Sequence, residues 1–283
     1  MTISSSLLSQ DDIQLCRRYA IQPDQIDKAA AFHAPTPCSA LSLMRKGSSQ
    51  PVMLASNMPV IAGLVTELCG QSSSGKTQAC LTIAVDIFVA TGKRVIYIDS
   101  ELSFSAVRLL QIGAARYPEK LQCPSKLTEL SSSIIVIQSM DPAKVMDILK
   151  RLEEDVVKHN VGAIIIDSIP AICRSDAWEH QQKYEYLGNL AMQIKYVAGT
   201  YNILCVTTNQ VNEQFRYEAG HATPGSTTFP ALGLQWNHSA NVRYLLSFDV
   251  HCQRVVSILK SPFSNSITVP FQITESGFIA VPC

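Results

Sequence analysis

The 283-residue chain carries little charge of either sign, and its 23 basic and 23 acidic residues cancel. A neutral balance argues against a protein that coats nucleic acid by bulk charge alone, although it is compatible with a local basic patch. Charged residues make up only 16% of the chain, whereas hydrophobic residues make up 47%. This composition predicts that much of the chain is buried in a sheet covered on both faces.

The sequence also lacks paired cysteines and long apolar segments. Its nine cysteines are scattered, odd in number and never spaced as C-x-x-C, which argues against a zinc site. Several lie in apolar stretches, where a free thiol behaves as a small core residue and suits a reducing compartment. No apolar run reaches about 18 residues, and residues 1–6 lack the basic and apolar regions of a secretion signal. We therefore expect a soluble intracellular protein.

The first 59 residues differ in pattern from the rest. Residues 1–33 contain two short helical patterns, one that begins with a capping box from Ser9 to Asp12 and one that begins at Pro23. Residues 34–59 are rich in proline and serine, and they are predicted to be a linker with a short helical piece near 41–45. We expect a small or truncated helical segment at 1–33, a linker at 34–59 and an α/β core at 60–283.

Within the core, apolar strands alternate with helices. Strands are expected at 65–68, 95–99, 134–138, 163–167 and 203–208. This alternation indicates βαβ units, and hence a mostly parallel twisted sheet with helices on both faces. After residue 236 the pattern changes to successive strands joined by short turns, which predicts an antiparallel C-terminal extension of the sheet. The strands of the extension are expected at 242–248, 254–259, 267–273 and 278–281.

The most specific motif is G-x-x-x-x-G-K-[ST], which lies between an apolar strand and a helix. It comprises Gly70, Gln71, Ser72, Ser73, Ser74, Gly75, Lys76 and Thr77. The glycines permit backbone angles and close approaches that a Cβ would block, so the N–H groups of the loop can point at phosphate oxygens. Lys76 can reach the β- and γ-phosphates, and the Thr77 hydroxyl can join the shell of a Mg²⁺ ion. The motif predicts a nucleoside triphosphate site; the alternative is a Gly/Ser turn before a helix.

Three polar groups follow apolar strands, at the edge where open parallel sheets bind ligands. Asp167 can be the second acid of a Mg²⁺ site, or it can cap a helix or turn. In Asp99-Ser100-Glu101, a carboxylate can orient the water that attacks the γ-phosphate, or the stretch can be a solvated acidic turn. In Thr208-Asn209-Gln210, an amide can sense the γ-phosphate, or the stretch can be a polar turn.

Two polar segments without clear periodicity follow these strands, at 174–183 and 211–228. The second is about 18 residues long, which exceeds what compact domains usually leave without structure, so we expect it to be functional or mobile. Its basic residue, Arg216, is equally compatible with a solvated loop. The six histidines of the chain show no metal-binding spacing.

Taken together, the motifs resemble one family over about residues 60–283. The stretches that carry the resemblance are Thr66-Glu67-Leu68, Gly75-Lys76-Thr77-Gln78, Tyr97-Ile98-Asp99-Ser100-Glu101, Asp167-Ser168, Thr208-Asn209-Gln210-Val211 and Pro230-Ala231-Leu232-Gly233-Leu234-Gln235-Trp236. Their order resembles the eukaryotic RecA-family recombinases, and within these the recombinase paralogues that assist strand exchange. The Ala-Leu-Gly-x-x-Trp stretch with Asn237, Asn241 and Arg243 looks most like the branches labelled B and XRCC-type.

The resemblance implies a RecA-type P-loop ATPase core that binds ATP and Mg²⁺ and hydrolyses ATP weakly, with stimulation by DNA. It implies that Lys76 binds phosphate, and that Thr77 and Asp167 hold the Mg²⁺ ion. It further implies that Glu101 is the catalytic glutamate. Gln210 matches the family's γ-phosphate sensor, which leads into the second DNA-binding loop.

The resemblance also implies further contacts to nucleotide and DNA. Gln78 belongs to the nucleotide-binding set, and Arg108 matches an arginine that packs on the adenine, which suits a planar guanidinium. The segments 174–183 and 211–228 match the family's two DNA-binding loops. Their candidate DNA contacts are Arg174, Lys183 and Arg216.

The chain departs from the active recombinases of that family in three places. Only residues 1–33 could serve as the helical N-terminal domain, and Phe32-His33-Ala34-Pro35 does not match the Phe-x-x-Ala sequence that docks on the next subunit. The first loop is shortened and reads Ala177-Trp178-Glu179-His180-Gln181-Gln182, without the arginines expected of a strand-gripping loop. These departures weaken the case for a long filament made by this chain alone.

The resemblance and its departures favour a nuclear paralogue that works with other paralogues and the main recombinase. Such a protein assists the assembly or stability of recombinase filaments on single-stranded DNA in homologous recombination and double-strand-break repair. Two alternatives remain open at this stage. One is an active recombinase that forms its own filament, and the other is a non-catalytic, ATP-bound interaction subunit.

Overall fold

The computed structural model describes residues 51–174, 178–214, 217–218, 221–222, 227–230 and 232–281. The chain divides into two compact units, Met1–Lys46 and Gly47–Cys283, and the fold described here is that of the second unit. The helical segment expected at 1–33 and the linker expected up to residue 50 lie outside the described residues, as does Arg216.

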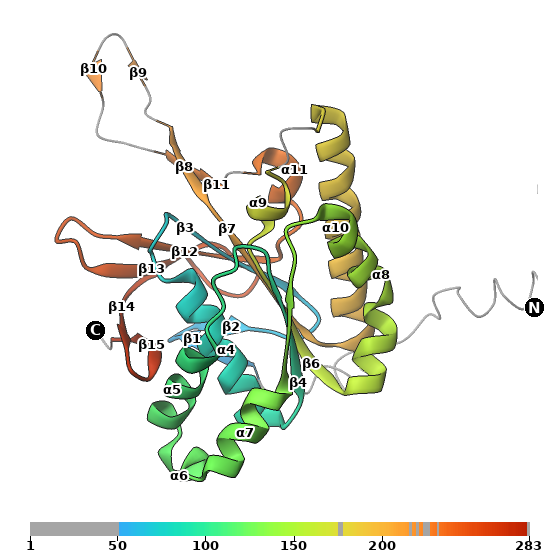
Figure 1. The fold of residues 1–283 in the computed structure, drawn as a ribbon. Coiled ribbons are helices and arrows are strands. Elements are labelled where there is room, and N and C mark those ends of the chain that lie inside the picture. The colour runs from blue at the N-terminus through green and yellow to red at the C-terminus, as the bar shows by residue number, and fades with distance from the viewer. Residues whose placement is uncertain are drawn as a thin grey trace, which may run out of the picture. The chain divides into compact units, whose positions relative to one another are not determined.

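A nine-stranded sheet forms the centre of this unit, in the order β15-β14-β13-β12-β3-β7-β6-β4-β5 (Figure 1). The parallel part consists of β3 (Val65–Gly70), β4 (Arg94–Asp99), β5 (Ile134–Gln138), β6 (Val161–Asp167), β7 (Leu204–Asn209) and β12 (Val242–Phe248). The antiparallel part consists of β13 (Arg254–Lys260), β14 (Thr268–Thr274) and β15 (Gly277–Ala280). The predicted mixture of a mostly parallel sheet and an antiparallel C-terminal extension is confirmed, but β12 joins the parallel part, because it pairs in parallel with β3.

Helices cover both faces of the sheet, because its parallel strands are apolar on both sides. In β6, Ala163 and Ile165 pack in one core cluster, whereas Ile164 and Ile166 pack in the other. The first cluster is covered by α4 (Lys76–Thr91), α5 (Ala106–Arg116) and α7 (Pro124–Ser133), with the short α6 (Pro118–Leu121) between the last two. The second is covered by α8 (Pro142–His159) and α10 (His180–Tyr201), with the short α9 (Ile169–Ile172) and α11 (Gly233–Asn237).

Helix α8 shows how the local sequence determines an element. Its N-cap is Asp141, whose Oδ1 accepts a hydrogen bond from Ala143 N at 2.9 Å, and Pro142 occupies the first position. The helix ends at Asn160, which adopts a left-handed conformation with φ 50°. Its buried residues are Val145, Leu149, Leu152 and Val156, at the helical spacing that the sequence shows.

An N-terminal hairpin, formed by β1 (Val52–Ala55) and β2 (Met58–Val60), lies within the predicted linker 34–59. Met58 and Val60 are fully buried, and Tyr244 OH donates a hydrogen bond to Pro59 O at 2.9 Å. The expected linker therefore has to be corrected, because its last residues belong to the folded core. Proline and serine suggested a linker here, but the burial of alternate apolar side chains stabilises a hairpin.

Parts of the two predicted loops form a helix and strands among the described residues. Helix α10 begins at His180 with a capping box between Glu179 and Gln182, so Lys183 lies in a helix and the first loop is shorter than 174–183. In the second segment, β8 (Val211–Gln214) pairs with β11 (Thr227–Pro230), and β9 (Tyr217–Glu218) pairs with β10 (His221–Ala222). The second loop is thus built on antiparallel arms, which its composition did not indicate.

Four of the cysteines in the described part of the chain are free thiols in the core. They are Cys69, Cys80, Cys173 and Cys205. Burial raises the pKa of both Cys69 and Cys205 to about 12, so these thiols stay protonated at neutral pH. Among the described helices, none has the length and apolar character needed to span a membrane.

Candidate functional site

The phosphate-binding motif forms the turn between β3 and α4, and its two glycines are required by the geometry. A Cβ on Gly70 would lie 2.3 Å from Leu246 O and 2.6 Å from Ser74 Oγ. Gly75 has a φ of +110°, and a Cβ there would lie 2.8 Å from Ile273 Cδ1. Larger residues would therefore push the loop away from the neighbouring strands.

The loop wraps around the side chain of Lys76. Its Nζ donates hydrogen bonds to Gly70 O at 2.9 Å and to Gln71 O at 2.7 Å. Burial lowers the pKa of Lys76, while the negative charges of Asp167 and Glu101 oppose that shift. The ammonium group of Lys76 is thus held within the loop. From this position it can exchange its backbone carbonyl partners for the oxygens of a bound anion.

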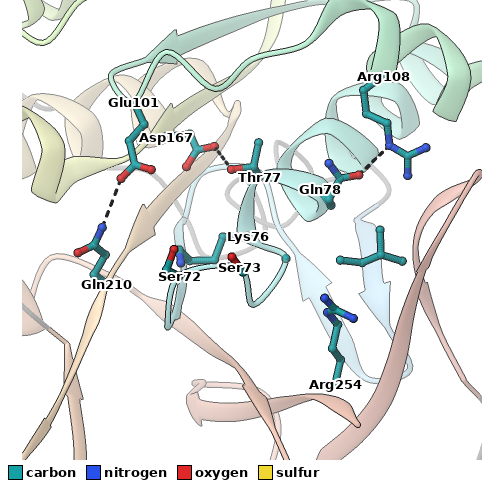
Figure 2. Close-up of a pocket in the computed structure, with 12 residues that line it drawn as sticks. Ser72, Ser73, Lys76, Thr77, Gln78, Glu101, Arg108, Asp167, Gln210 and Arg254 are labelled. Carbon is teal, nitrogen blue, oxygen red and sulfur yellow. Dashed lines mark hydrogen bonds between the residues drawn. The ribbon is translucent and has the colours of Figure 1, made fainter. Parts of the chain in front are cut away.

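Asp167, the last residue of β6, accepts hydrogen bonds from three hydroxyl groups, one on helix α4 and one on each neighbouring strand, β4 and β7. Thr77 Oγ1 and Tyr97 OH donate to Asp167 Oδ2 at 2.7 and 2.9 Å, and Thr208 Oγ1 donates to Oδ1 at 2.5 Å. Burial raises the pKa of Asp167, and the three hydroxyl groups act in the opposite direction. The hydrogen bond of 2.7 Å joins Asp167 to Thr77, and these are the two residues that the sequence analysis assigns to Mg²⁺ (Figure 2).

The structure distinguishes between the two acids at the end of β4, of which Asp99 is the last residue of the strand and Glu101 lies two residues beyond it. Asp99 is fully buried and accepts hydrogen bonds from the backbone N–H groups of Ser103 and Phe104, both at 3.0 Å. It therefore shapes the turn and leaves no free face toward a ligand. Glu101, by contrast, extends beyond the turn and lines the cavity described below.

Glu101 meets groups from three other segments. Its Oε1 accepts a hydrogen bond from Ser168 Oγ at 2.6 Å and a long one from Gln210 Nε2 at 3.5 Å (Figure 2). Arg174 Nη2 lies 3.9 Å from the same oxygen. Residues that the sequence nominated separately as catalytic glutamate and γ-phosphate sensor therefore face each other, and a residue of the first loop joins them.

The guanidinium N–H groups of Arg108, on α5, donate hydrogen bonds to oxygen atoms of the protein. Its Nε donates to Gln78 Oε1 at 2.8 Å, and its Nη1 donates to Gln111 Oε1 at 2.8 Å and to Glu275 O at 3.2 Å. Its Nη2 donates to Thr274 O. Because these donors are engaged, the guanidinium can meet a ligand chiefly through its flat face, which is the mode expected for packing on a base.

These groups line one cavity of about 500 Å³. The lining residues are Ser72, Ser73, Gly75, Lys76, Thr77, Gln78, Glu101, Arg108, Asp167, Gln210, Arg254 and Ile273. Of the residues nominated as DNA contacts, Arg174 lies beside Glu101, whereas Lys183 lies on α10 and Arg216 is outside the described residues. Arg254 and Ile273 were not nominated, because one arginine and one isoleucine in β-strands carry no local signal of a site.

A parallel sheet with a glycine-bounded phosphate loop after β3, an acid at the end of β6 and an amide after β7 defines a P-loop nucleotide-binding protein of the RecA type. The Rad51 family model matches residues 43–281, so the chain belongs to the Rad51 family. The members of this family are P-loop ATPases, and membership implies ATP binding.

The chain is distantly similar to several Rad51 paralogues. It is 26% identical to the DNA repair protein RAD51 homolog 2 of Homo sapiens over 246 residues, which cover 78% of this chain and 64% of the relative. It is 30% identical to the protein of the same name from Arabidopsis thaliana over 235 residues, or 76% and 63% of the two chains. It is 26% identical to the DNA repair protein RAD51 homolog 3 of Cricetulus griseus over an aligned length of 298 residues, which covers 95% of this chain and 79% of the relative.

These similarities confirm the resemblance to Rad51 paralogues that the motifs predict. The chain spans a little less than two thirds of the length of the RAD51 homolog 2 proteins of Homo sapiens and Arabidopsis thaliana.

Proposed function

We propose that this chain is an ATP-binding, DNA-dependent ATPase that acts as a recombinase paralogue in homologous recombination and double-strand-break repair. Its task is to assist the assembly or stability of recombinase filaments on single-stranded DNA in the nucleus. The observation that carries the proposal is the single cavity in which the phosphate loop faces Glu101, Asp167 and Gln210. The relatives named above are DNA repair proteins, which supports the cellular role.

The residues of the cavity fit a triphosphate with Mg²⁺. Ser74 Oγ is buried and has no hydrogen-bond partner among the described residues, as expected of a loop that completes its contacts with a ligand. Lys76 would hold the phosphates, and Thr77 and Asp167 would hold Mg²⁺, because hydroxyl and carboxylate oxygens are the ligands that this ion prefers. When bound, Mg²⁺ neutralises negative charge on the phosphate oxygens.

In this proposal, Glu101 acts on the attacking water. Its carboxylate lines the cavity and can accept or direct a proton, and the hydrogen bond from Ser168 Oγ keeps one oxygen in place. Arg174 and Gln210 lie next to that same oxygen, and Arg174 begins one of the two segments that we assign to DNA while Gln210 directly precedes the other. A strand bound at these segments would act on Glu101 through them, which supports hydrolysis that is weak in isolation and stimulated by DNA.

The partners follow from the same proposal. Arg174, Lys183 and Arg216 are the candidate contacts to single-stranded DNA. The neutral net charge argues against coating of DNA by this chain alone. The similarity to Rad51 paralogues supports assembly with other paralogues and with the main recombinase.

The test of the nucleotide site is Lys76→Ala, measured by titration with Mg-ATP. We expect ATP binding to be lost, because the main cation at the phosphates has been removed without replacement. Lys150→Ala, a lysine exposed on α8, serves as the matched control and should leave the affinity unchanged. Survival of ATP binding in Lys76→Ala would show that the phosphate assignment is wrong.

The test of the catalytic assignment is Glu101→Gln. ATP should still bind, while kcat should fall by about 10²- to 10⁴-fold, the contribution that a positioned general base usually makes. Glu154→Gln on the exposed face of α8 is the control. Unchanged turnover would place the base elsewhere, whereas absence of turnover in the unaltered chain would favour the alternative of a non-catalytic subunit.

The alternative of a self-assembling recombinase is tested by electron microscopy of the purified chain with ATP and single-stranded DNA. We expect no long regular filament unless partner subunits are added. Regular filaments of this chain alone would contradict the paralogue role. Copurification from cells, followed by identification of the bound proteins, would then name the partners.

A further inference from the structure

The β12–β13 hairpin brings an arginine to the edge of the sheet where the phosphate loop begins. Strand β12 runs parallel to β3 with Leu246 opposite Gly70. Phe248 therefore lies two residues beyond that level, and its antiparallel partner across the hairpin is Arg254. The turn between them is held by Asp249 Oδ1, which accepts hydrogen bonds from two backbone N–H groups at 2.8 Å. The position of Arg254 is thus set by strand register.

The side chain of Arg254 is restrained on one side and unsatisfied on the other. Its guanidinium carbon lies 5.3 Å from the centroid of the Phe248 ring, within the range of a cation–π contact. Its Nε is buried and has no hydrogen-bond partner in the described part of the chain. A buried donor of this kind is normally satisfied by protein, water or ligand. Arg254 lines the nucleotide cavity, so a ligand there can supply the missing acceptor.

Unlike Arg254, the other two cationic side chains that line the cavity have hydrogen-bond partners in the protein. Lys76 is bonded to two backbone carbonyls of the loop, and Arg108 donates to two glutamine side chains and two backbone carbonyls. Among the described residues, no carboxylate lies within ion-pair distance of Arg254. In Figure 2, Arg254 lies across the phosphate loop from Glu101.

We propose that Arg254 binds the phosphate chain of the nucleotide as a second cation beside Lys76. The proposal rests on the function proposed above and extends it to the antiparallel part of the sheet. A guanidinium presents parallel N–H donors that match two phosphate oxygens, and the Phe248 ring keeps its plane in place. The neighbouring lining residue on β14, Ile273, is apolar and offers no acceptor, so the donors of Arg254 remain for the ligand.

The test compares two probes, Mg-ATP and inorganic tripolyphosphate with Mg²⁺, because the second lacks base and ribose. In the full chain, Arg254→Met retains the packing on Phe248 and removes the charge. We expect it to weaken both probes by the same factor, about tenfold or more, as for a lost charge-assisted hydrogen bond. Arg254→Lys should weaken both by a smaller factor. Arg151→Ala, an exposed arginine on α8, is the matched control and should change neither.

Each other outcome overturns the proposal in a distinguishable way. Unchanged affinity for both probes would show that Arg254 does not contact the nucleotide. Weaker binding of ATP with unchanged binding of tripolyphosphate would show that Arg254 contacts the base or the ribose. Thermal unfolding without nucleotide verifies that each variant is folded, and if Arg254→Met is not, the Lys variant decides by the same comparison. If the unaltered chain binds neither probe, the proposed function fails together with Arg254; if only Lys76→Ala abolishes binding, Arg254 alone fails.

Discussion

Among single residues, a buried charge pair supports the site without touching the cavity. Glu67 of β3 is fully buried, and Arg243 of β12, only 4% exposed, donates from Nε to its carboxylate. Glu67 Oε1 also accepts hydrogen bonds from Asn209 Nδ2 at 2.8 Å and Trp236 Nε1 at 2.7 Å. Since β3 leads into the phosphate loop and Asn209 precedes Gln210, this cluster joins the two strands that carry opposite ends of the site.

Removing one charge of this pair should lower the free energy of unfolding much more than neutralising both charges. We expect Arg243→Met to lower the free energy of unfolding by about 3–5 kcal/mol, because it leaves the buried Glu67 without its cation. The double variant Glu67→Gln with Arg243→Met should be more stable than Arg243→Met alone. Urea unfolding of the four proteins of this double-mutant cycle checks both statements. Equal stability of the single and double variants would show that the loss comes from packing and not from charge.

The residues of the site differ in how far the sequence predicts them. Lys76 and Thr77 follow from the motif, whose residues are adjacent in the chain. The choice between Asp99 and Glu101 could not be made from the residues alone, since both lie at the end of the same strand. The choice depends on which carboxylate accepts hydrogen bonds from the backbone N–H groups of Ser103 and Phe104. Only the folded backbone shows that Asp99 is this acceptor.

At the scale of elements, most strands and helices of the core follow from apolar periodicity, and the misses have a common cause. The β1–β2 hairpin, the short α6 and α7, and the arms of the second loop are short or polar, so periodicity has too few residues to show. These elements exist because neighbours pack against them or pair with them. Such contacts join parts of the chain that are distant in sequence.

The hairpin offers a direct test of its place in the core. Met58 is fully buried, whereas Met53 in the same hairpin is 46% exposed. We expect Met58→Ala to lower the free energy of unfolding by about 2–5 kcal/mol, as for other large-to-small changes in a core. Met53→Ala, the matched control, should change it by no more than about 0.5 kcal/mol. Equal effects in thermal or urea unfolding would mean that the hairpin does not pack as described.

For the molecule as a whole, the absence of net charge limits how DNA can be bound. Contacts to phosphates release counterions, and the logarithm of the affinity falls with the logarithm of salt concentration by about 0.7 for each phosphate of a single strand. The three candidate contacts Arg174, Lys183 and Arg216 therefore predict a slope of about −2. This value is small compared with that of proteins that neutralise many phosphates.

The slope is measured from the affinity for single-stranded DNA over a series of KCl concentrations. Arg174→Ala should make it shallower by about 0.7, while Arg151→Ala on α8 should leave it unchanged. A slope steeper than about −5 would contradict the assignment of so few contacts, and it would favour a chain that grips DNA by itself.

The amino-acid sequence by itself determined the phosphate loop, the order of strands and helices and the family resemblance, because these depend on residues that are neighbours in the chain. Tertiary structure decided that Thr77 meets Asp167, that Glu101 faces Gln210, and that Arg254 reaches the same cavity. These pairs are brought together by the register of strands that pair far from one another in sequence. The alternation of apolar residues sets which face each side chain takes, but which strands become neighbours, and at what level, depends on packing over the whole sheet.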